Sequence, residues 1–454
     1  MDTKKLRQKI LDLAIHGKLV PQDPNDEPAS VLLERIKAEK ERLIKEGKIK
    51  RSKKSAKTSD TPHYGNVPFE VPEGWVWTIV GEVGEVITGS TPSKDIAEYY
   101  GGDIPFYKPT DLDLGINTNS ASDTLTIEGY NLSRKLPVGS ILVTCIGATI
   151  GKTGLISTEG ACNQQINAII PSSLITSTFL YYSCISEYFQ KEIRNHASAT
   201  TLPILNKNNF TKLLIPLPPL SEQQRIVKEI ERWFALIEQI EQSKADLQTT
   251  TKQTKSKILD LATHGKLVPQ DPNDVPAIEL LKRINPDFTP CDNGHYAQLP
   301  QSWSLAPMQA LCSLVDGEKQ NGIERTNLDV KYLRGEREAK TLTSGKYVAA
   351  NSLLILVDGE NSGEVFRTPI EGYQGSTFKQ LSINDNMNTD YVLQVIHLHR
   401  KTLRENKVGS AIPHLNKKIF RAIEVPIPPY REQQRIVDAI NIAFRHLDTI
   451  MESL

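Results

Sequence analysis

Residues 9–36 read KILDLAIHGKLVPQDPNDEPASVLLERI, and residues 257–284 read KILDLATHGKLVPQDPNDVPAIELLKRI. A second repeat matches IPLPPLSEQQRIVKEI at 215–230 with VPIPPYREQQRIVDAI at 425–440. In mid-chain the second block opens a predicted helical stretch that leads into the first block, whereas in the other copy this stretch is split between the C-terminus and the N-terminus. The sequence therefore predicts two similar halves closed into a ring, with an approximate two-fold relation between two modules.

Length and composition limit the class of protein. A chain of 454 residues has room for about three domains. No run approaches the ~20 apolar residues that span a bilayer, so we expect no membrane segment. A net charge of zero does not exclude nucleic acid, because local clusters of charge decide such binding. The odd cysteine count without CxxC spacing indicates a reducing cytoplasm; the residues are Cys145, Cys162, Cys184, Cys291 and Cys312.

The repeats divide the chain into six segments. They are the N-terminal half of a split helical repeat (1–36), a basic linker (37–60), a first module (61–215), a central helical connector (216–284), a second module (285–425) and a C-terminal helix that pairs with the connector (426–454). Every charge at 48–57 is positive, which fits either a flexible solvated linker or an arm that contacts phosphates.

The connectors carry apolar residues at helical spacing, which is typical of a helix-pairing seam. Because the same stripe occurs twice and the chain reverses between modules, we expect the two stripes to pack on each other, antiparallel. Residues 221–263 would form one helix of roughly 60 Å. It would end at His264-Gly265, as an equivalent helix ends at His16-Gly17. The helix-pairing residues are Val227, Ile230, Phe234 and Ile237, and Val437, Ile440, Phe444 and Leu447.

Short apolar runs inside the modules predict strands, and residues 177–196 predict one helix. The predicted fold class is α+β: two mixed α/β modules joined by long antiparallel helical connectors in a circular repeat. The modules are similar in their first and last segments, where for example Trp75 aligns with Trp303, but their sequences diverge between those segments. A fixed frame with a variable interior is what two different binding preferences would require.

Enzyme-like strings are weak in this chain. Residues 147–153 resemble a phosphate-binding loop, but Ile146 stands where the first glycine is needed. The string Ile427-Pro-Pro-Tyr430 resembles an adenine-methyltransferase motif without its asparagine, and it is more simply the start of a helix. We find no catalytic or metal-ligating constellation in the sequence and expect neither a catalytic residue nor a metal site.

Polar and basic loops remain as candidate DNA contacts, because Lys, Arg, Asn, Gln, Ser and Thr contact phosphates and base edges. The candidates in the first module are Thr88, Ser90, Thr91, Ser93, Lys94, Lys108, Thr110, Thr149, Lys152, Asn163, Gln164, Asn206 and Lys207. Those in the second module are Lys319, Arg325, Arg334, Arg337, Lys379, Gln380, Asn416 and Lys417.

Five sequence strings, taken in order, resemble the specificity subunit of type I restriction-modification systems. The resemblance rests on GSTPSK at 89–94, YYGGDIPFY at 99–107, ILVTCIGATIGK at 141–152, NQQ at 163–165 and PLPPLSEQQRIV at 216–227. The second module lacks GSTPSK and has VDGENSG at 357–363 instead of the TCIG loop, which implies a different half-site.

The resemblance implies that each module is a target recognition domain for one half of a bipartite, asymmetric DNA site, with the connectors setting the gap. It implies two methyltransferase subunits that carry S-adenosylmethionine, and restriction/translocase subunits that use ATP and magnesium. This chain would hold no cofactor and act in the cytoplasm as a non-catalytic subunit. The alternatives are a regulator that binds DNA alone and a coiled-coil scaffold that does not touch DNA.

Overall fold

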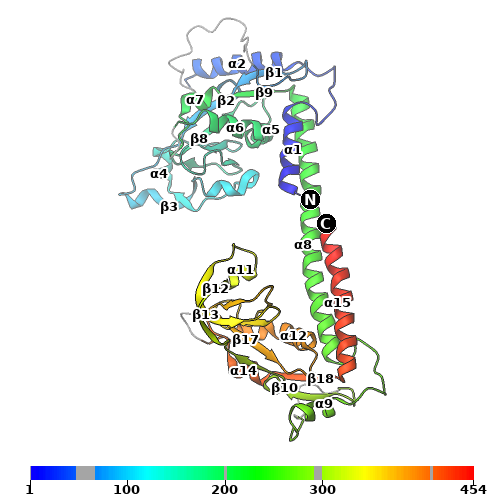
Figure 1. Ribbon diagram of the computed structural model, residues 1–454. Helices are drawn as coiled ribbons and strands as arrows, with labels where there is room; N and C mark the ends of the chain where they lie inside the picture. The colour runs from blue at the N-terminus through cyan, green and yellow to red at the C-terminus, as the bar shows by residue number, and fades with distance from the viewer. Residues whose placement is uncertain (1, 48–66, 199–201, 291–298, 409–412, 454) are drawn as a thin grey trace. The chain divides into compact units, whose positions relative to one another are not determined.

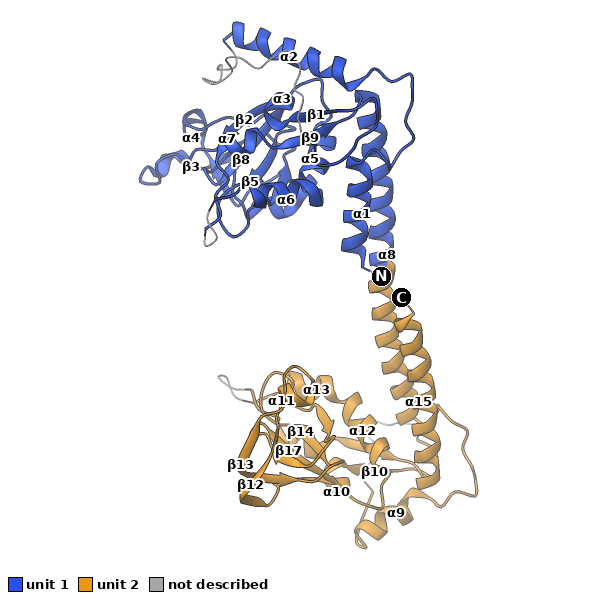
Figure 2. Cartoon of the chain, turned by 45° about the horizontal axis from the view of Figure 1, so that its top comes forward, with its two compact units in different colours: residues 1–242 blue, residues 243–454 orange. Residues whose placement is uncertain are grey.

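The chain folds into two compact units. They are Met1–Gln242 and Ser243–Leu454 (Figure 2). The division falls inside one long helix, so each unit contains part of that helix and one of the two predicted modules. Both units mix helices and sheets, as the sequence predicted. The computed structural model describes residues 2–47, 67–198, 202–290, 299–408 and 413–453.

Unit 1 begins with two helices, continues through a module of short strands and helices, and ends in the first part of helix α8 (Figure 1). In chain order the elements are α1 (Thr3–Ile15), α2 (Ala29–Lys45), β1 (Val76–Ile79), α3 (Val80–Val83), β2 (Gly84–Thr88), η1 (Ala97–Tyr99), β3 (Tyr100–Tyr107), η2 (Asp111–Asn117), β4 (Asp123–Leu125), α4 (Ile127–Leu132), β5 (Ile141–Thr144), β6 (Thr153–Leu155), β7 (Ala161–Cys162), β8 (Ile166–Pro171), α5 (Ser177–Ile185), α6 (Glu187–Asn195), α7 (Lys207–Thr211), β9 (Leu214–Leu217) and α8 (Leu220–Thr263).

The central sheet of unit 1 is antiparallel and has the strand order β2-β8-β5-β6. Its middle strands are buried on both faces, which explains their unbroken apolar runs. Ile141 and Val143 of β5 pack with helix α5 in the main core, whereas Leu142 faces a second cluster that contains Tyr107. A smaller sheet has the order β4-β3-β7, and β1 pairs with β9 where the chain enters and leaves the module.

Unit 2 repeats the order of the strands and lacks counterparts of η1 and α4 among its described residues. Its elements are the last part of α8, then α9 (Ala277–Ile284), β10 (Ser304–Pro307), α10 (Met308–Leu311), β11 (Cys312–Val315), β12 (Lys319–Leu328), α11 (Val330–Leu333), β13 (Thr341–Val348), β14 (Leu353–Leu356), β15 (Val365–Arg367), β16 (Gly372–Gln374), β17 (Phe378–Ile383), α12 (Thr389–Leu398), α13 (Arg400–Glu405), α14 (Lys417–Ala422), β18 (Glu424–Ile427) and α15 (Tyr430–Glu452).

The sheet of unit 2 has the order β11-β17-β14-β15, which matches β2-β8-β5-β6 strand for strand. Likewise, β10 pairs with β18 as β1 pairs with β9. Strand β12 is followed by a short helix and an antiparallel strand and pairs in parallel with β16, as β3 pairs with β7. The internal repeat read from the sequence is therefore a repeat of whole units.

Helix α8 is a single element of 44 residues, as the connector pattern predicted. In unit 1 its first part lies antiparallel to α1: both guanidinium nitrogens of Arg7 bond the carboxylate of Glu241 at 2.7 and 2.9 Å. In unit 2 its last part lies antiparallel to α15, where Lys255 pairs with Asp448 at 2.6 Å. At about 1.5 Å per residue, the whole helix is roughly 66 Å long.

The C-terminal helix α15 pairs with the connector helix α8, as predicted, but the two apolar stripes do not pack on each other. Ile230 and Ile237 are buried in the core of unit 1 with residues of α1, and Val227 and Phe234 pack against that core. Val437 and Ile440 are buried in the core of unit 2 with the end of α8, Phe444 packs against it, and Leu447 is half-buried. Each stripe thus packs on the repeat of 9–15 in its own unit, because periodicity gives the buried face of a helix but not what covers it.

Both helices that precede the His-Gly pairs end there. Gly17 and Gly265 adopt φ values of 64° and 66°, the left-handed conformation that glycine tolerates best. The Nδ1 atoms of His16 and His264 each lie 2.7 Å from a backbone oxygen one helical turn earlier. The two histidines therefore complete helix ends, as the sequence predicted.

In unit 1, side chains of the recurring Glu-Gln-Gln-Arg block connect helix α8 to the module and to the segment between α1 and α2. Glu222 is buried and accepts hydrogen bonds from Trp75 Nε1 at 2.8 Å and Gln22 Nε2 at 2.7 Å. Burial raises the pKa of Glu222 despite these two donors. Arg225 pairs with Asp26 at 2.6 Å, and this bond lowers the pKa of the Asp26 carboxyl.

Unit 2 repeats the same contacts with its own residues. Glu432 accepts from Trp303 Nε1 at 3.1 Å and from Gln270 Nε2 at 2.7 Å. Arg435 pairs with Asp274 at 2.7 Å. The block therefore recurs because three elements meet on it in each unit, and each contact needs its own side chain.

Two local predictions need correction. Residues 177–196 form α5 and α6 rather than one helix, because the backbone is extended at Ser186, whose hydroxyl caps α6 by accepting from the N–H of Phe189 at 3.3 Å. Helix α2 continues to Lys45, so the predicted linker boundary at residue 37 falls inside a helix. The basic run at 48–57 lies outside the described residues. Among the residues described, no helix is long and apolar enough to cross a membrane.

Candidate nucleic-acid interface

Three loops of unit 1 lie at the same end of its central sheet: one follows β2, one precedes β8 and one joins β5 to β6. In the order β2-β8-β5-β6, each strand runs opposite to its neighbour, so the ends of β2 and β5 meet the starts of β8 and β6. These termini are Thr88, Ile166, Thr144 and Thr153. Most of the first module's candidate residues fall in these loops, which we call the loop end of the sheet.

The 88–91 loop and the 163–165 loop lie side by side at this end. The backbone N–H of Ser90 donates to the oxygen of Cys162 at 2.9 Å, and Thr88 Oγ1 donates to Asn167 Oδ1 at 2.6 Å. Thr91 Oγ1 bonds the side chain of Gln164. The structure thus brings together Thr88, Ser90, Thr91, Asn163 and Gln164, which are far apart in the sequence.

Lys108 and Lys152 lie near these loops and are both ion-paired. The N–H of Asn163 donates to the oxygen of Tyr107 at 3.1 Å, which places the residue after Tyr107 beside the second loop. Lys108 pairs with Asp123, and Lys152 Nζ lies 2.7 Å from a carboxylate oxygen of Asp113. To hold a phosphate, each ammonium group would have to leave or share its carboxylate.

The remaining candidates of unit 1 lie on exposed turns. Thr110 precedes η2, Ser93 bonds Asp95 at 3.4 Å, and the carbonyl of Thr149 accepts from the N–H of Lys152. Lys94 is exposed, and no ion pair of it is seen within the described part of the chain. The assignment of these residues as DNA contacts stays a prediction.

Asn206 and Asn416 recur because each begins a helix. Asn206 Oδ1 accepts from the N–H of Asn209 at 2.9 Å, and Asn416 Oδ1 accepts from the N–H of Ile419 at 3.2 Å. Each is followed by an exposed lysine, Lys207 or Lys417. The N–H of Leu205 donates to the oxygen of Cys145 at 2.8 Å, so in unit 1 this turn also lies at the loop end.

The loop end of unit 2 is arranged in the same way. Lys379 and Lys346 both pair with Asp316, and their hydrogen bonds lower the pKa of the Asp316 carboxyl to about 2. Gln380 Nε2 donates to the carbonyl of Tyr347 at 2.8 Å. The sequence found Lys379 and Gln380 but missed Lys346 and Asp316, because neither lies in a motif.

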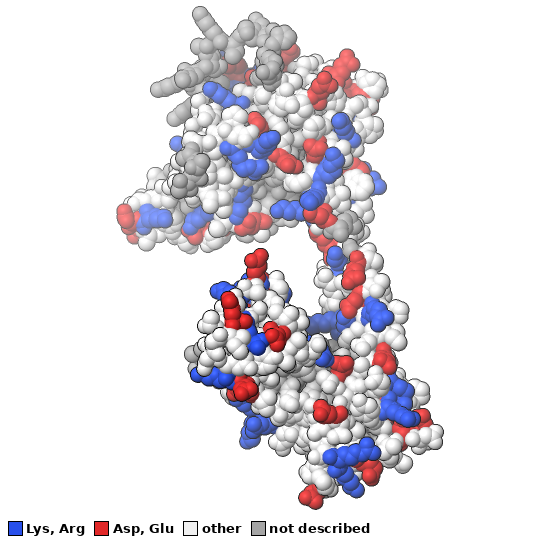
Figure 3. All heavy atoms as spheres, viewed as in Figure 1, with Lys and Arg blue, Asp and Glu red and all other residues white. Residues whose placement is uncertain are grey.

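The candidate arginines of unit 2 are bound to carboxylates. Arg325 pairs with Glu371, and its guanidinium lies 4.6 Å from the ring centre of Tyr347. Arg334 pairs with Glu364, and Arg337 pairs with Asp329. Lys319 is exposed on β12. Basic and acidic side chains accordingly alternate over the face of each unit that Figure 3 shows.

Arg134 is a further residue that the sequence analysis missed. Its Nη1 donates to the carbonyl of Thr88, and its backbone N–H donates to Ser90 Oγ at 3.2 Å. It holds the 88–91 loop from a segment more than forty residues away. No local pattern marks such a residue, because a lone arginine in a turn is ordinary surface composition.

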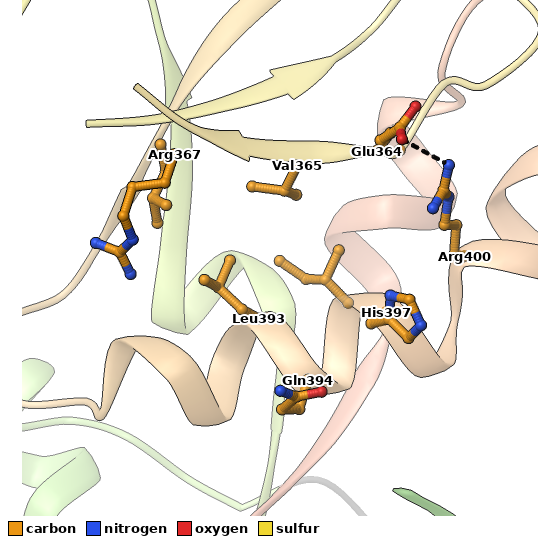
Figure 4. A pocket seen from close by; sticks show the side chains of 10 residues that line it. Glu364, Val365, Arg367, Leu393, Gln394, His397 and Arg400 are labelled. Carbon is orange, nitrogen blue, oxygen red and sulfur yellow. Dashed lines mark ion pairs between the residues drawn. The ribbon is translucent and has the colours of Figure 1, made fainter. Parts of the chain in front are cut away.

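A cavity of about 310 Å³ lies in unit 2 between β14, β15 and α12 (Figure 4). Val365 and Leu393 face each other across it, and Arg400 pairs with Glu364 at its rim at 3.2 Å. In unit 1 the position of Leu393 is taken by Tyr181, because α5 and α12 are held in the same register by Gln223 and Gln433. The equivalent positions thus carry side chains of different size in the two units.

The string at 147–153 does not have the geometry of a phosphate-binding loop. It joins β5 to β6, which pair antiparallel, whereas that motif needs a strand followed by a helix. Within the described residues, no group of three or more His, Cys, Asp or Glu side chains could hold a metal ion. Cys145, Cys162, Cys184 and Cys312 are buried free thiols, and Cys291 lies outside the described residues.

A family model described as "Type I restriction modification DNA specificity domain" matches residues 72–249 and 317–453. The two matches fall in both units and cover more than half of the chain.

Curated relatives of similar sequence are type I restriction enzyme specificity subunits. The EcoEI specificity subunit of Escherichia coli is 31% identical over 99% of this chain and 90% of its own length. The EcoAI specificity subunit of Escherichia coli is 29% identical over 79% of this chain and 70% of its own.

Two solved structures share the fold. One describes complex assembly and conformational transition of the type I R-M system; its chain matches with a TM-score of 0.62 at 17% identity, over 85% of this chain and 94% of that one. The other is the HsdS subunit from Thermoanaerobacter tengcongensis, with a TM-score of 0.52 at 18% identity, over 85% and 93%.

Proposed function

The chain belongs to the type I restriction-modification DNA specificity family, and on that premise we propose that each unit reads one half of a bipartite, asymmetric DNA site. The observation that carries this proposal is the loop end, which both units build on the same frame with different side chains. Two equal frames with unequal contact surfaces would select two unequal half-sites.

Helix α8 would set the gap between the half-sites. A helix of 44 residues is roughly 66 Å long, about two turns of duplex DNA at ~34–36 Å each. The antiparallel helices α1 and α15 would stiffen it, since each packs along the part of α8 in its own unit. Base pairs in the gap would then be unread, and their number would be fixed.

The chain would act in the cytoplasm as the non-catalytic part of a larger complex. Two methyltransferase subunits would bring S-adenosylmethionine and flip the target adenine out of the duplex. Restriction/translocase subunits would bring ATP and magnesium. The match to the family over both units does not favour the alternative, a regulator that binds DNA alone.

Mapping of adenine methylation tests the proposal. The chain would be co-expressed with its cognate methyltransferase subunit in a host without other adenine methylation, and N6-methyladenine would be located by single-molecule sequencing. We expect a split, asymmetric motif that is methylated on both strands and is lost without this chain. A continuous motif, or methylation that does not need the chain, would contradict the proposal.

A further inference from the structure

One position at the loop end carries an apolar pair in unit 1 and a hydrogen-bonded polar pair in unit 2. In unit 1, Ile146 and Ile204 form an isolated antiparallel backbone bridge. In unit 2, Asp358 and His414 form the corresponding bridge. The next residue donates to a proline oxygen in both units: Gly147 at 3.0 Å and Gly359 at 2.7 Å. The backbone is thus the same, and only the side chains differ.

The polar pair of unit 2 is accessible. His414 Nδ1 lies 2.6 Å from Asp358 Oδ1, and the side chains are 50% and 32% exposed, respectively. Backbone bonds hold the pair on both sides: the N–H of Leu415 donates to Val357 at 2.7 Å, and the N–H of Asp358 donates to Thr377 at 3.3 Å. Two polar side chains are therefore presented to solvent on a fixed backbone, which a reading contact requires.

A cavity of about 590 Å³ opens beside this pair and carries a surplus of cations. Lys346, Lys379 and Lys417 line it together with His414 and Asp358. A lone carboxylate would be repelled by DNA phosphates. Here, three ammonium groups outnumber the two carboxylates Asp316 and Asp358 and offset that repulsion, so the Asp358 carboxylate can approach a base edge.

We infer that Asp358 and His414 are sequence-reading residues of unit 2, and that they recognise the exocyclic amino group of a base in the major groove. The inference rests on the proposed function. A carboxylate only accepts hydrogen bonds, so it selects the N4 amine of cytosine or the N6 amine of adenine. In the tautomer that donates from Nδ1 to Asp358, Nε2 of His414 is a second acceptor. Ile146 and Ile204 offer only methyl groups, so unit 1 reads a different edge at this position.

The test compares methylated motifs in the intact complex for the wild-type chain, Asp358→Asn and His414→Ala. An asparagine keeps the size of the side chain but replaces an acceptor with a donor. We expect one base pair of the unit 2 half-site to lose about 5- to 150-fold of its discrimination, which corresponds to about 1–3 kcal/mol at 1.4 kcal/mol per tenfold. The half-site of unit 1 and the other positions of the unit 2 half-site should stay unchanged, which shows that both units of the variant are folded.

Asp390→Asn is the matched control. Asp390 pairs with Arg367 at 3.0 Å, and Arg367 lies opposite Leu353 at the other end of the β14–β15 pair. That variant should keep the wild-type motif, although it also removes one exposed carboxylate of unit 2. A relaxed C·G pair in the Asp358→Asn motif would identify cytosine as the base, and a relaxed A·T pair would identify adenine.

Two results would overturn the inference. One is an unchanged motif in both reading variants, and the other is an equal loss at every position of both half-sites. A wild-type chain that supports no methylation would instead overturn the proposed function, and the inference with it.

Discussion

Replacement of Glu222 by glutamine is expected to loosen unit 1 without affecting unit 2. Glu222 is 1% exposed, and its two oxygens accept from Trp75 and Gln22 at 2.8 and 2.7 Å. A glutamine has one carbonyl oxygen and one NH₂ group, so one buried donor would lose its acceptor. An unpaired buried donor costs about 1–3 kcal/mol, and relief of the buried charge offsets part of that cost.

The size of this effect should depend on pH. Burial raises the pKa of Glu222 above its ordinary value of 4.5. A raised carboxyl pKa gives a contribution to stability that is complete below the unfolded value and is lost as pH rises through the folded value. Glutamine does not titrate. The free energy of unfolding of the wild type should therefore exceed that of Glu222→Gln most at acid pH, and the difference should shrink as pH rises.

Hydrogen exchange of the full chain, followed by mass spectrometry, measures this locally. Peptides from α1 and from residues 17–28 should exchange faster in Glu222→Gln by the factor that about 1–3 kcal/mol predicts, roughly 5- to 150-fold. Glu432→Gln is the matched control, because Glu432 makes the equivalent contacts and should change only peptides of unit 2. Equal changes in both units, or none in either, would refute the local role of the contact.

Three further perturbations give separate tests. Phe234→Asp should detach α1 from α8 and expose that region to proteolysis, whereas Ile240→Asp should not, since Ile240 is 40% exposed; equal cleavage of the two would contradict the packing. Asp316→Asn should free Lys346 and Lys379 from their shared carboxylate and so raise the affinity for DNA. In anisotropy titrations, the slope of log K against log salt concentration should become steeper by up to about 0.9 for each new phosphate contact. An unchanged slope would contradict this. Gly17→Ala should lower the melting temperature more than Gly47→Ala, because both have positive φ but only the first new Cβ would lie 2.3 Å from a proline carbon.

The sequence predicted the frame well because the frame repeats. The block at 221–227 recurs, and its side chains make the same contacts in each unit. The sequence repeat therefore predicted a repeat of the structure. Helix pairing was only half predictable. The stripe through Ile230 showed which face of the helix is buried. Its partner, α1, lies more than two hundred residues away in the sequence, and the sequence identified that region only as the repeat of residues 257–284.

The loop end was predicted as a set of loops but not as a set of contacts. Polar loops such as 88–94 were found from composition and from the family resemblance, and the antiparallel sheet explains why they gather. The carboxylates that pair with the candidate cations were missed, as for Lys379 and Asp316, because ion pairs join residues that have no fixed sequence spacing. Asp358 and His414 were missed for another reason: the equivalent residues of unit 1 are isoleucines, so a search for repeated chemistry passes over them.

The two units also show how a frame can persist while its side chains change. Lys152 and Glu364 occupy the same position, since the carbonyl of each accepts from the N–H of the last residue of the preceding strand, at 2.8 Å in both units. Lys152 pairs with Asp113, whereas Glu364 pairs with Arg334, so the ion pair is reversed in sign. The partners also lie at equivalent places: Asp113 lies between β3 and β4, and Arg334 lies between β12 and β13. Both units therefore keep opposite charges at this contact although the residues differ, so the same frame accommodates different side chains at the loop end.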